Sequence, residues 1–218
     1  MNKPYHLVVF DWEGTLGDTL GNVLNILTLE ARRMHLGQFD EHLARHYLTY
    51  GLAVAIKKIF PKLTAHQQDE LTHSVRLAMA SPGADVYLIP GAQAVVEKMK
   101  IAGIHLAIAT NKGHNSLRRN LQAAHMDSFF PVTRAADQVP AKPCPQMLEE
   151  IMDEYGVSAV ETLMVGDSVS DIEMAAAIGV DAIGVNFYNQ KEQARELLAA
   201  GALYVFDDYQ QLLDYMQL

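Results

Sequence analysis

The sequence of 218 residues predicts an α/β fold, in which a doubly wound parallel sheet carries an inserted helical domain. Two observations lead to this prediction. From about residue 90 onward, short apolar runs alternate with amphipathic segments of helical period, the pattern of strands and helices in a parallel sheet. Between residues 18 and 84 the pattern is helical throughout, and it interrupts this alternation after the first strand.

The first strand is expected at residues 5–10, because Leu7-Val8-Val9-Phe10 is a short, continuous apolar run. An amphipathic helix follows, with apolar residues at helical spacing up to Met34, and Gly37 is expected to end it. The chain is then predicted to be helical to about residue 80. Thr64-Ala65-His66-Gln67 is typical of a capping box that opens the last of these helices, and Ser81-Pro82-Gly83 breaks it.

The second part of the chain is predicted to alternate regularly between helix and strand. Helices are expected at 91–102, 113–124, 145–155, 171–178, 191–200 and the C-terminus, and strands at 104–109, 130–133, 162–165, 181–185 and 204–206. The predicted domains are therefore a core of residues 1–17 and 85–218 and a helical insert of residues 18–84. The linkers are expected near Gly17 and near Gly83 to Asp85.

The composition is that of a folded globular protein, since half of the residues are hydrophobic and a fifth are charged. A formal charge of −9 argues against nucleic acid or an anionic membrane as a partner. Cys144 has no second cysteine to pair with, which favours a reducing compartment. The N-terminal residues lack the pattern of a signal peptide, and no apolar run approaches the length of a membrane span. We therefore expect a cytoplasmic protein.

Polar side chains follow three of the predicted strands at the point where each strand ends. Asp11 follows the first apolar run, Thr110 the second, and Asp167 the run at 163–166. If these strands are parallel neighbours, the three side chains meet at one edge of the sheet, where ligands bind in open α/β folds. Lys142 lies in a loop between two prolines, and such rigid placement is consistent with binding a charged group.

A tight turn follows Asp11. Gly14 and Thr15 offer backbone N–H groups and a hydroxyl, which suit an anion. The segment Asp11-Trp12-Glu13-Gly14-Thr15 resembles the nucleophile motif of the haloacid dehalogenase (HAD) superfamily, usually written DxDGT. Three further segments resemble the other motifs of this superfamily, in the expected order. They are Ile108-Ala109-Thr110-Asn111-Lys112, Lys142-Pro143 and Gly166-Asp167-Ser168-Val169-Ser170-Asp171.

The resemblance covers essentially the whole chain. It implies a Rossmann-like core and, because the helical insert lies between the first and second motifs, a helical cap of the C1 type. Among the members of the superfamily, the chain looks most similar to those like phosphoglycolate phosphatase.

The resemblance also implies a Mg²⁺-dependent phosphatase that hydrolyses a small phosphorylated metabolite, a phosphate monoester, through an aspartyl phosphate. Asp11 would be the nucleophile, and Asp11, the backbone carbonyl of Glu13, Asp167 and Asp171 would form the metal site, with Asp171 orienting a water. Thr110 and Lys142 would bind the phosphoryl oxygens. Gly14, Thr15 and Asn111 would be further substrate-binding residues. A monomer or a homodimer is expected.

Glu13 stands where phosphatases of this superfamily carry the second Asp, which protonates the leaving group and then activates water. Glutamate can do both, but its extra methylene extends the carboxylate by roughly 1.3 Å. Two alternatives stay open. One is a non-catalytic phosphate-binding protein that lost turnover through Glu13. The other is a phosphonoacetaldehyde hydrolase-like enzyme, which the Asp-Trp-x-Gly-Thr form echoes and which needs a cap lysine, for which Lys57 and Lys58 are candidates.

Other conspicuous residues receive structural interpretations. Lys112 and Arg118-Arg119 are expected on a solvated helix face, and Cys144 is expected to pack as a small side chain. The histidines show no metal-ligand spacing.

Overall fold

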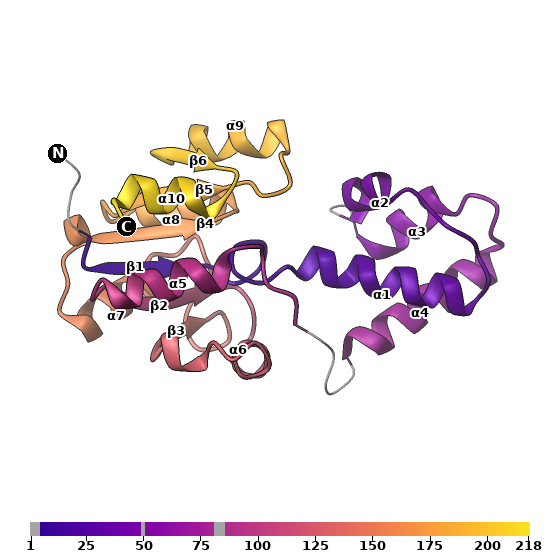
Figure 1. The fold of residues 1–218 in the computed structure, drawn as a ribbon, viewed down its shortest axis with the longest axis horizontal. Coiled ribbons are helices and arrows are strands. Elements are labelled where there is room, and N and C mark those ends of the chain that lie inside the picture. Colours follow the sequence, from indigo (N-terminus) through magenta and orange to yellow (C-terminus); the bar gives the residue numbers. More distant parts are fainter. Residues whose placement is uncertain (1–4, 49–50, 81–85) are drawn as a thin grey trace. The chain divides into compact units, whose positions relative to one another are not determined.

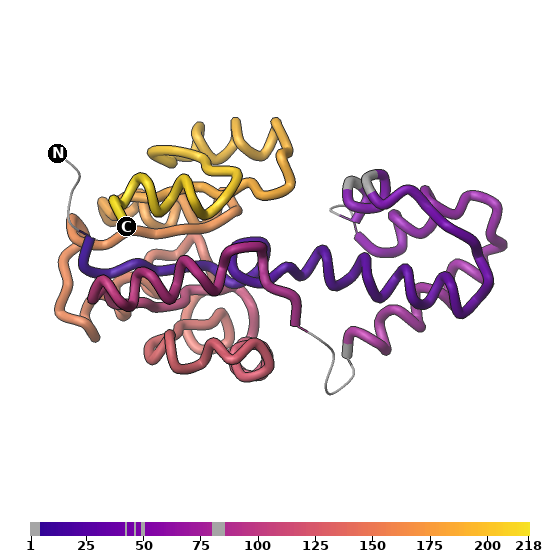
Figure 2. Tube along the Cα trace, in the orientation of Figure 1, coloured from indigo at the N-terminus to yellow at the C-terminus, as the bar shows by residue number. Residues whose placement is uncertain are grey.

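The computed structural model describes residues 5–48, 51–80 and 86–218. The chain divides into two compact units, Met1–Asp18 with Leu88–Leu218, and Thr19–Tyr87. Figures 1 and 2 follow the chain through both units. The predicted helix break at 81–83 and the predicted linker at 83–85 lie outside the described residues.

The larger unit is built on a sheet of six parallel strands, as predicted. The strand order is β3-β2-β1-β4-β5-β6, so β1 lies near the middle and the order of the strands reverses there. The strands are β1 (Leu7–Phe10), β2 (His105–Thr110), β3 (Val132–Ala135), β4 (Thr162–Gly166), β5 (Asp181–Val185) and β6 (Tyr204–Phe206). In an open α/β sheet, ligands bind beyond the carboxyl ends of the strands at this point of reversal.

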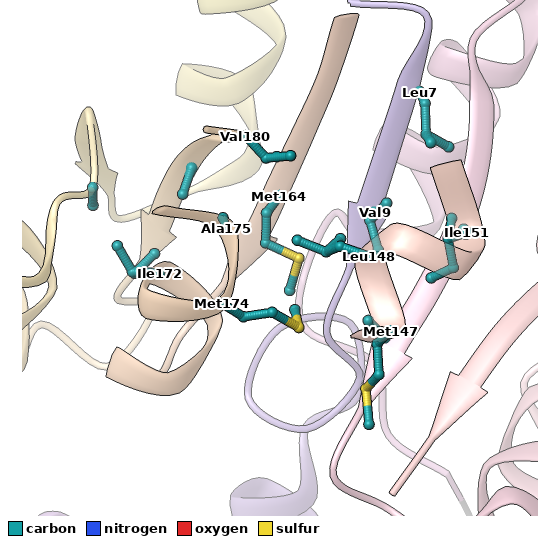
Figure 3. Close-up of a cluster of buried hydrophobic side chains, with 14 of the residues drawn as sticks. Leu7, Val9, Met147, Leu148, Ile151, Met164, Ile172, Met174, Ala175 and Val180 are labelled. Carbon is teal, nitrogen blue, oxygen red and sulfur yellow. The ribbon is translucent and has the colours of Figure 1, made fainter. Parts of the chain in front are cut away.

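Helices cover both faces of the sheet, because the strands are apolar on both sides. On one face, Leu7 and Val9 pack with Met164 against α7 (Gln146–Tyr155), α8 (Val169–Ala176) and α9 (Lys191–Ala200), as Figure 3 shows for part of this cluster. Val8 and Phe10 point to the other face, where α5 (Ala92–Ile101) packs against β2 and α10 (Tyr209–Met216) packs against α5 and β6. The helix α6 (His114–Ala123) lies against β3.

The smaller unit is helical and has a core of its own. Its helices are α1 (Thr19–Arg33), α2 (Glu41–Leu48), α3 (Leu52–Ile59) and α4 (Ala65–Ala80). Their apolar faces enclose a cluster made of Ile26, Leu27, Ala31, Ile56, Phe60, Leu71 and Val75. The capping box forms as expected. The backbone N–H of Gln67 donates to Thr64 Oγ1 (3.3 Å), and the backbone N–H of Thr64 donates to Gln67 Oε1 (3.0 Å).

Three elements differ from the predicted bounds by two residues. The first strand begins at Leu7 and not at residue 5, since its pairing with β2 and β4 begins there. The third strand begins two residues later than predicted. Phe130 follows a 3-10 turn at Asp127–Phe129 and is buried in the core, where its ring lies edge-on to that of Phe10 with the ring centroids 6.3 Å apart. Helix α8 begins at Val169, two residues earlier than expected, because Ser168 caps it. Within the described ranges, no helix has both the length and the apolar character that crossing a bilayer demands.

The chain leaves and rejoins the larger unit at neighbouring points. Ile89 N donates to Leu16 O at 2.9 Å, and Gly17 and Leu88 form an antiparallel bridge. Gly17 also has no room for a side chain, since an added Cβ would lie 2.7 Å from Trp12 Nε1. The end of the turn that follows β1 is therefore held in place by Leu88 and Ile89, where the chain rejoins the larger unit.

Candidate active site

The side chains that follow the three central strands meet at one edge of the sheet. β1 pairs in parallel with β2 on one side and β4 on the other, and Asp11 N extends the β1–β4 ladder by donating to Val165 O at 2.9 Å. Asp11 after β1, Thr110 at the end of β2 and Asp167 after β4 therefore share the carboxyl edge. The convergence that the sequence predicts is present in the structure.

Three carboxylates cluster at this edge. Asp11, Asp167 and Asp171 each offer an oxygen, and these oxygens lie within 4.8 Å of one another. Burial raises the pKa of the Asp11 carboxyl to about 6, although the charge of Lys142 lowers it. Burial also raises the pKa of Asp167 well above its ordinary value, and the negative charge of Asp11 adds to this. Ionising these buried, crowded carboxyls is therefore costly, and a further positive charge at the site would favour their ionised forms.

Lys142 provides a positive charge inside this cluster. Its buried Nζ donates to Asp11 Oδ1 (2.7 Å), Asp171 Oδ1 (2.5 Å) and the Ala109 carbonyl (3.2 Å). Burial lowers the pKa of Lys142, but the charges of Asp11 and Asp171 outweigh burial and raise it above its ordinary value. Lys142 is therefore a fixed ammonium beside the Asp11 carboxylate.

Asn111 and Asp171 hold this arrangement in place. The side-chain amide of Asn111 forms two hydrogen bonds with the backbone of Lys142. Its Oδ1 accepts from the Lys142 N–H at 2.9 Å, and its Nδ2 donates to the Lys142 carbonyl at 3.4 Å. The second carboxylate oxygen of Asp171 accepts from Ser168 N (3.0 Å) and Oγ (2.7 Å) and so caps α8. Gly166 makes room for Asp171, since an added Cβ would lie 2.4 Å from its Cγ. The expected substrate-binding Asn111 thus contacts Lys142 in this structure.

The turn after Asp11 packs directly against Asp167. Gly14 has φ +71°, and an added Cβ would lie 2.2 Å from Asp167 Oδ2. Thr15 is fully buried, its Oγ1 donates to Asp167 Oδ1 at 3.4 Å, and its carbonyl accepts from the Tyr209 hydroxyl. Gln193 Nε2 donates to the Asp167 carbonyl at 2.6 Å. The turn and the Asp167 loop are therefore locked together.

The cluster opens into a pocket of about 300 Å³. The residues that line it all have polar or charged side chains: Asp11, Glu13, Thr110, Asn111, Lys112, Lys142, Ser168 and Ser170. Glu13 is the more exposed of the carboxylates here, with 38% of its side chain accessible, and it forms an ion pair with Lys112. The pocket thus combines a buried nucleophile candidate with an acid/base candidate at its mouth.

The family model of haloacid dehalogenase-like hydrolases matches residues 8–185, which include all four motif segments. The chain belongs to this family. A phosphoglycolate phosphatase of Rhodospirillum rubrum is 29% identical over 219 residues, which cover 96% of this chain and 90% of that protein. A protein of Dickeya dadantii named probable phosphatase IndB is 33% identical over 194 residues, covering 85% of this chain and 82% of its own.

Solved structures of the family share the fold. A HAD family hydrolase from Deinococcus radiodurans R1, determined with bound phosphate and sodium, superposes with a TM-score of 0.76 at 19% identity. The match covers 100% of this chain and 99% of that hydrolase. A predicted phosphoglycolate phosphatase from Haemophilus somnus gives a TM-score of 0.68 at 22% identity, with 97% of both chains covered. The predicted membership of the superfamily, with its likeness to phosphoglycolate phosphatases, is confirmed.

Several residues of the site in this HAD-like hydrolase are not identified by the sequence interpretation, among them Lys112 and Tyr209. The prediction that Lys112 lies on a solvated helix face is wrong. Lys112 lies in the loop between β2 and α6, with 19% of its side chain exposed, and it binds Glu13. Its place directly after Thr110-Asn111 in the second motif segment was a signal that could have identified it. Tyr209 is fixed by tertiary packing, and no motif or period in the sequence distinguishes it.

Gly14→Ala tests whether the turn positions Asp167. An alanine here costs about 1–2 kcal/mol because of the positive φ, and its Cβ must also displace the Asp167 carboxylate. We expect stability to fall by that amount and turnover to fall by at least about 10-fold, since small misplacements at a reacting centre are costly. Unfolding curves and steady-state rates measure both.

Gly156→Ala is the matched control, because Gly156 has φ +65° and no atom lies within 4 Å of an added Cβ. It should lose similar stability and keep its turnover. If Gly14→Ala retained the turnover of Gly156→Ala, the turn would not be positioning Asp167.

Proposed function

We propose that this HAD-like hydrolase is a Mg²⁺-dependent phosphatase that hydrolyses a small phosphate monoester through an aspartyl phosphate on Asp11. The observation that carries the proposal is the pocket in which the buried Asp11 carboxylate meets Lys142 beside Thr110, with the Asp167 carboxylate clustered against Asp11. A phosphoryl group is anionic, and a carboxylate can attack it only where positive charge and hydrogen-bond donors offset the repulsion.

The donor set fits a magnesium ion. Three carboxylates lie together, and Lys142 contacts two of them, Asp11 and Asp171. Like charges this close repel unless a cation lies between them. Carboxylate and carbonyl oxygens are the ligands that Mg²⁺ prefers. We assign the carboxylates of Asp11 and Asp167 and the backbone carbonyl of Glu13 to the ion, with Asp171 reaching it through water. When bound, the ion supplies positive charge that neutralises the phosphoryl oxygens.

The residues of the chain then have defined tasks. Asp11 Oδ forms a bond to phosphorus while the bond from phosphorus to the substrate oxygen breaks, and Glu13 gives its proton to that oxygen. In the second step Glu13 takes a proton from the water that attacks phosphorus, and the Asp11–phosphorus bond breaks. Lys142 and Thr110 donate to the phosphoryl oxygens throughout. Gly14 shapes the turn beside Asp167, and its own N–H donates to the Gly17 carbonyl at 3.0 Å. Atoms and charge balance, since one water enters and one alcohol and one phosphate leave.

The names of the relatives suggest where to look for the substrate. Phosphoglycolate phosphatases match nearly the whole chain, so 2-phosphoglycolate is the first compound to test. We further propose that the helical unit, predicted at residues 18–84, is a cap that selects the substrate, and that residues 1–17 and 85–218 form the catalytic core. A cytoplasmic enzyme, working as a monomer or a homodimer, completes the proposal, in keeping with the single cysteine.

The decisive experiment measures phosphate release from an aryl phosphate and from 2-phosphoglycolate, with Mg²⁺ and with EDTA. We expect turnover that requires the metal. Phosphate binding without turnover would instead favour the non-catalytic alternative. Release of phosphate from phosphonoacetaldehyde, with borohydride trapping of a cap lysine, would favour the carbon–phosphorus hydrolase.

Glu13→Gln tests the acid/base role. Protonation of the leaving oxygen matters most when the alcohol is a poor leaving group, so turnover of an alkyl phosphate should fall by about 10²–10⁴-fold, the usual range for a general acid/base. Turnover of an aryl phosphate with a good leaving group should fall much less. Initial rates of the variant with both substrates measure this difference. If turnover of the alkyl and the aryl phosphate fell equally and only slightly, Glu13 would not be the acid/base.

A further inference from the structure

An ion pair at the mouth of the pocket joins two loops that are far apart in the sequence. Lys112 Nζ donates to Glu13 Oε1 across a separation of 99 residues. Both side chains line the pocket that contains Asp11. The pair is half-buried, since the accessible fractions are 19% for the lysine side chain and 38% for the glutamate side chain. Screening is therefore weaker here than for an exposed surface pair.

Lys112 is attached to the framework of the site. Its N–H donates to Thr110 Oγ1 at 3.2 Å, and the residue between them, Asn111, binds both backbone polar groups of Lys142. Lys142 in turn binds Asp11. The loop that carries Lys112 is therefore tied, through a short chain of hydrogen bonds, to the carboxylate that we propose as the nucleophile.

A glutamate needs such support more than an aspartate does. It has one more rotatable bond, whose freedom must be lost when the carboxylate is ordered. Its carboxylate also reaches further, and an error of about 1 Å at a reacting centre can cost about 100-fold in rate. A cation bonded to one oxygen, on a backbone that is itself hydrogen-bonded to Thr110, restricts both the reach and the rotation of the side chain.

We propose that Lys112 is a positioning residue for Glu13, and that this partnership allows a glutamate to serve as the acid/base in this enzyme. This inference rests on the proposed function. Lys112 occupies Oε1, so Oε2 is the oxygen that gives its proton to the leaving alcohol and takes one from the attacking water. Lys112 itself neither gives nor takes a proton.

The test is a double-mutant cycle of Lys112→Met and Glu13→Gln, assayed with an alkyl phosphate and an aryl phosphate. Lys112→Met should slow the alkyl substrate by about 10–100-fold, the effect of misplacing a catalytic group, and slow the aryl substrate much less. In the Glu13→Gln background the same change should cost little more, because a residue that acts through Glu13 has nothing left to position. Lys112→Arg should restore much of the alkyl activity.

Lys98→Met is the control for the loss of a positive charge, because Lys98 is exposed on α5. Melting temperatures show which variants fold, and if Lys112→Met does not, Lys112→Gln takes its place in the cycle. Equal losses on both substrates, or losses that multiply with those of Glu13→Gln, would overturn the inference, since Lys112 would then act on the substrate directly. A wild-type protein without Mg²⁺-dependent turnover overturns the proposed function, and this role with it.

Discussion

Asp11→Asn is expected to abolish turnover and leave the fold intact. The amide removes the anion that attacks phosphorus, and loss of a nucleophile costs on the order of 10⁴-fold or more in kcat. The amide also keeps an oxygen in the place of Oδ1, which accepts from Lys142 Nζ at 2.7 Å, and Lys142 keeps its ion pair with Asp171. Steady-state rates with Mg²⁺ and a thermal melt are the two measurements.

Asp153→Asn provides the matched control, since Asp153 is an exposed carboxylate on α7. It should behave as the wild type in both assays. Near-wild-type turnover by Asp11→Asn would contradict the mechanism, whereas loss of both turnover and folding would show that Asp11 is required for the architecture.

The second large effect is expected from Asp167→Asn, which should weaken Mg²⁺ binding by more than about 100-fold, since residues that only support a metal ligand already cost 10–100-fold. The change removes one of three clustered carboxylates and therefore much of the charge that draws a cation to the site. Titration calorimetry of the purified protein with Mg²⁺ measures this without an activity assay.

The surroundings of Asp167 make the variant informative. Thr15 Oγ1 and Gln193 bind the Asp167 loop, and an amide keeps the shape of the side chain, so the turn after β1 should stay in place. Asp153→Asn again serves as the control. Unchanged Mg²⁺ affinity in Asp167→Asn would assign the ion to other ligands.

The parts of this fold that sequence periodicity could predict are those in which local pattern and tertiary packing agree. β1, β2 and β4 are apolar runs that end in a polar residue, and each is present with its polar residue at the expected edge. The capping box at Thr64 is likewise a local signal, satisfied within one turn of helix. The sheet itself follows from the alternation of the elements.

The features that the sequence does not predict depend on long-range contacts. Lys112 precedes a helix and carries a charge, so its sequence neighbourhood indicates solvent, whereas its partner Glu13 lies on another loop. Phe130 belongs to an apolar run, but its ring is buried against Phe10, and the strand begins only after it. Asn111 is typical of a ligand-binding residue, and only the structure shows that its amide is engaged by the Lys142 backbone.

The bridge between Gly17 and Leu88 makes the helical insertion an interchangeable module. The points where the chain departs and comes back are already hydrogen-bonded to each other through Leu16 and Ile89, so a short turn suffices to connect them. The entropy cost of closing a flexible connection grows slowly with its length, by about 0.6 kcal/mol for each doubling, so segments of moderately different length differ little in this cost. A segment of a different length or origin can therefore be grafted at this seam while the register of β1, and with it the position of Asp11, stays as it is.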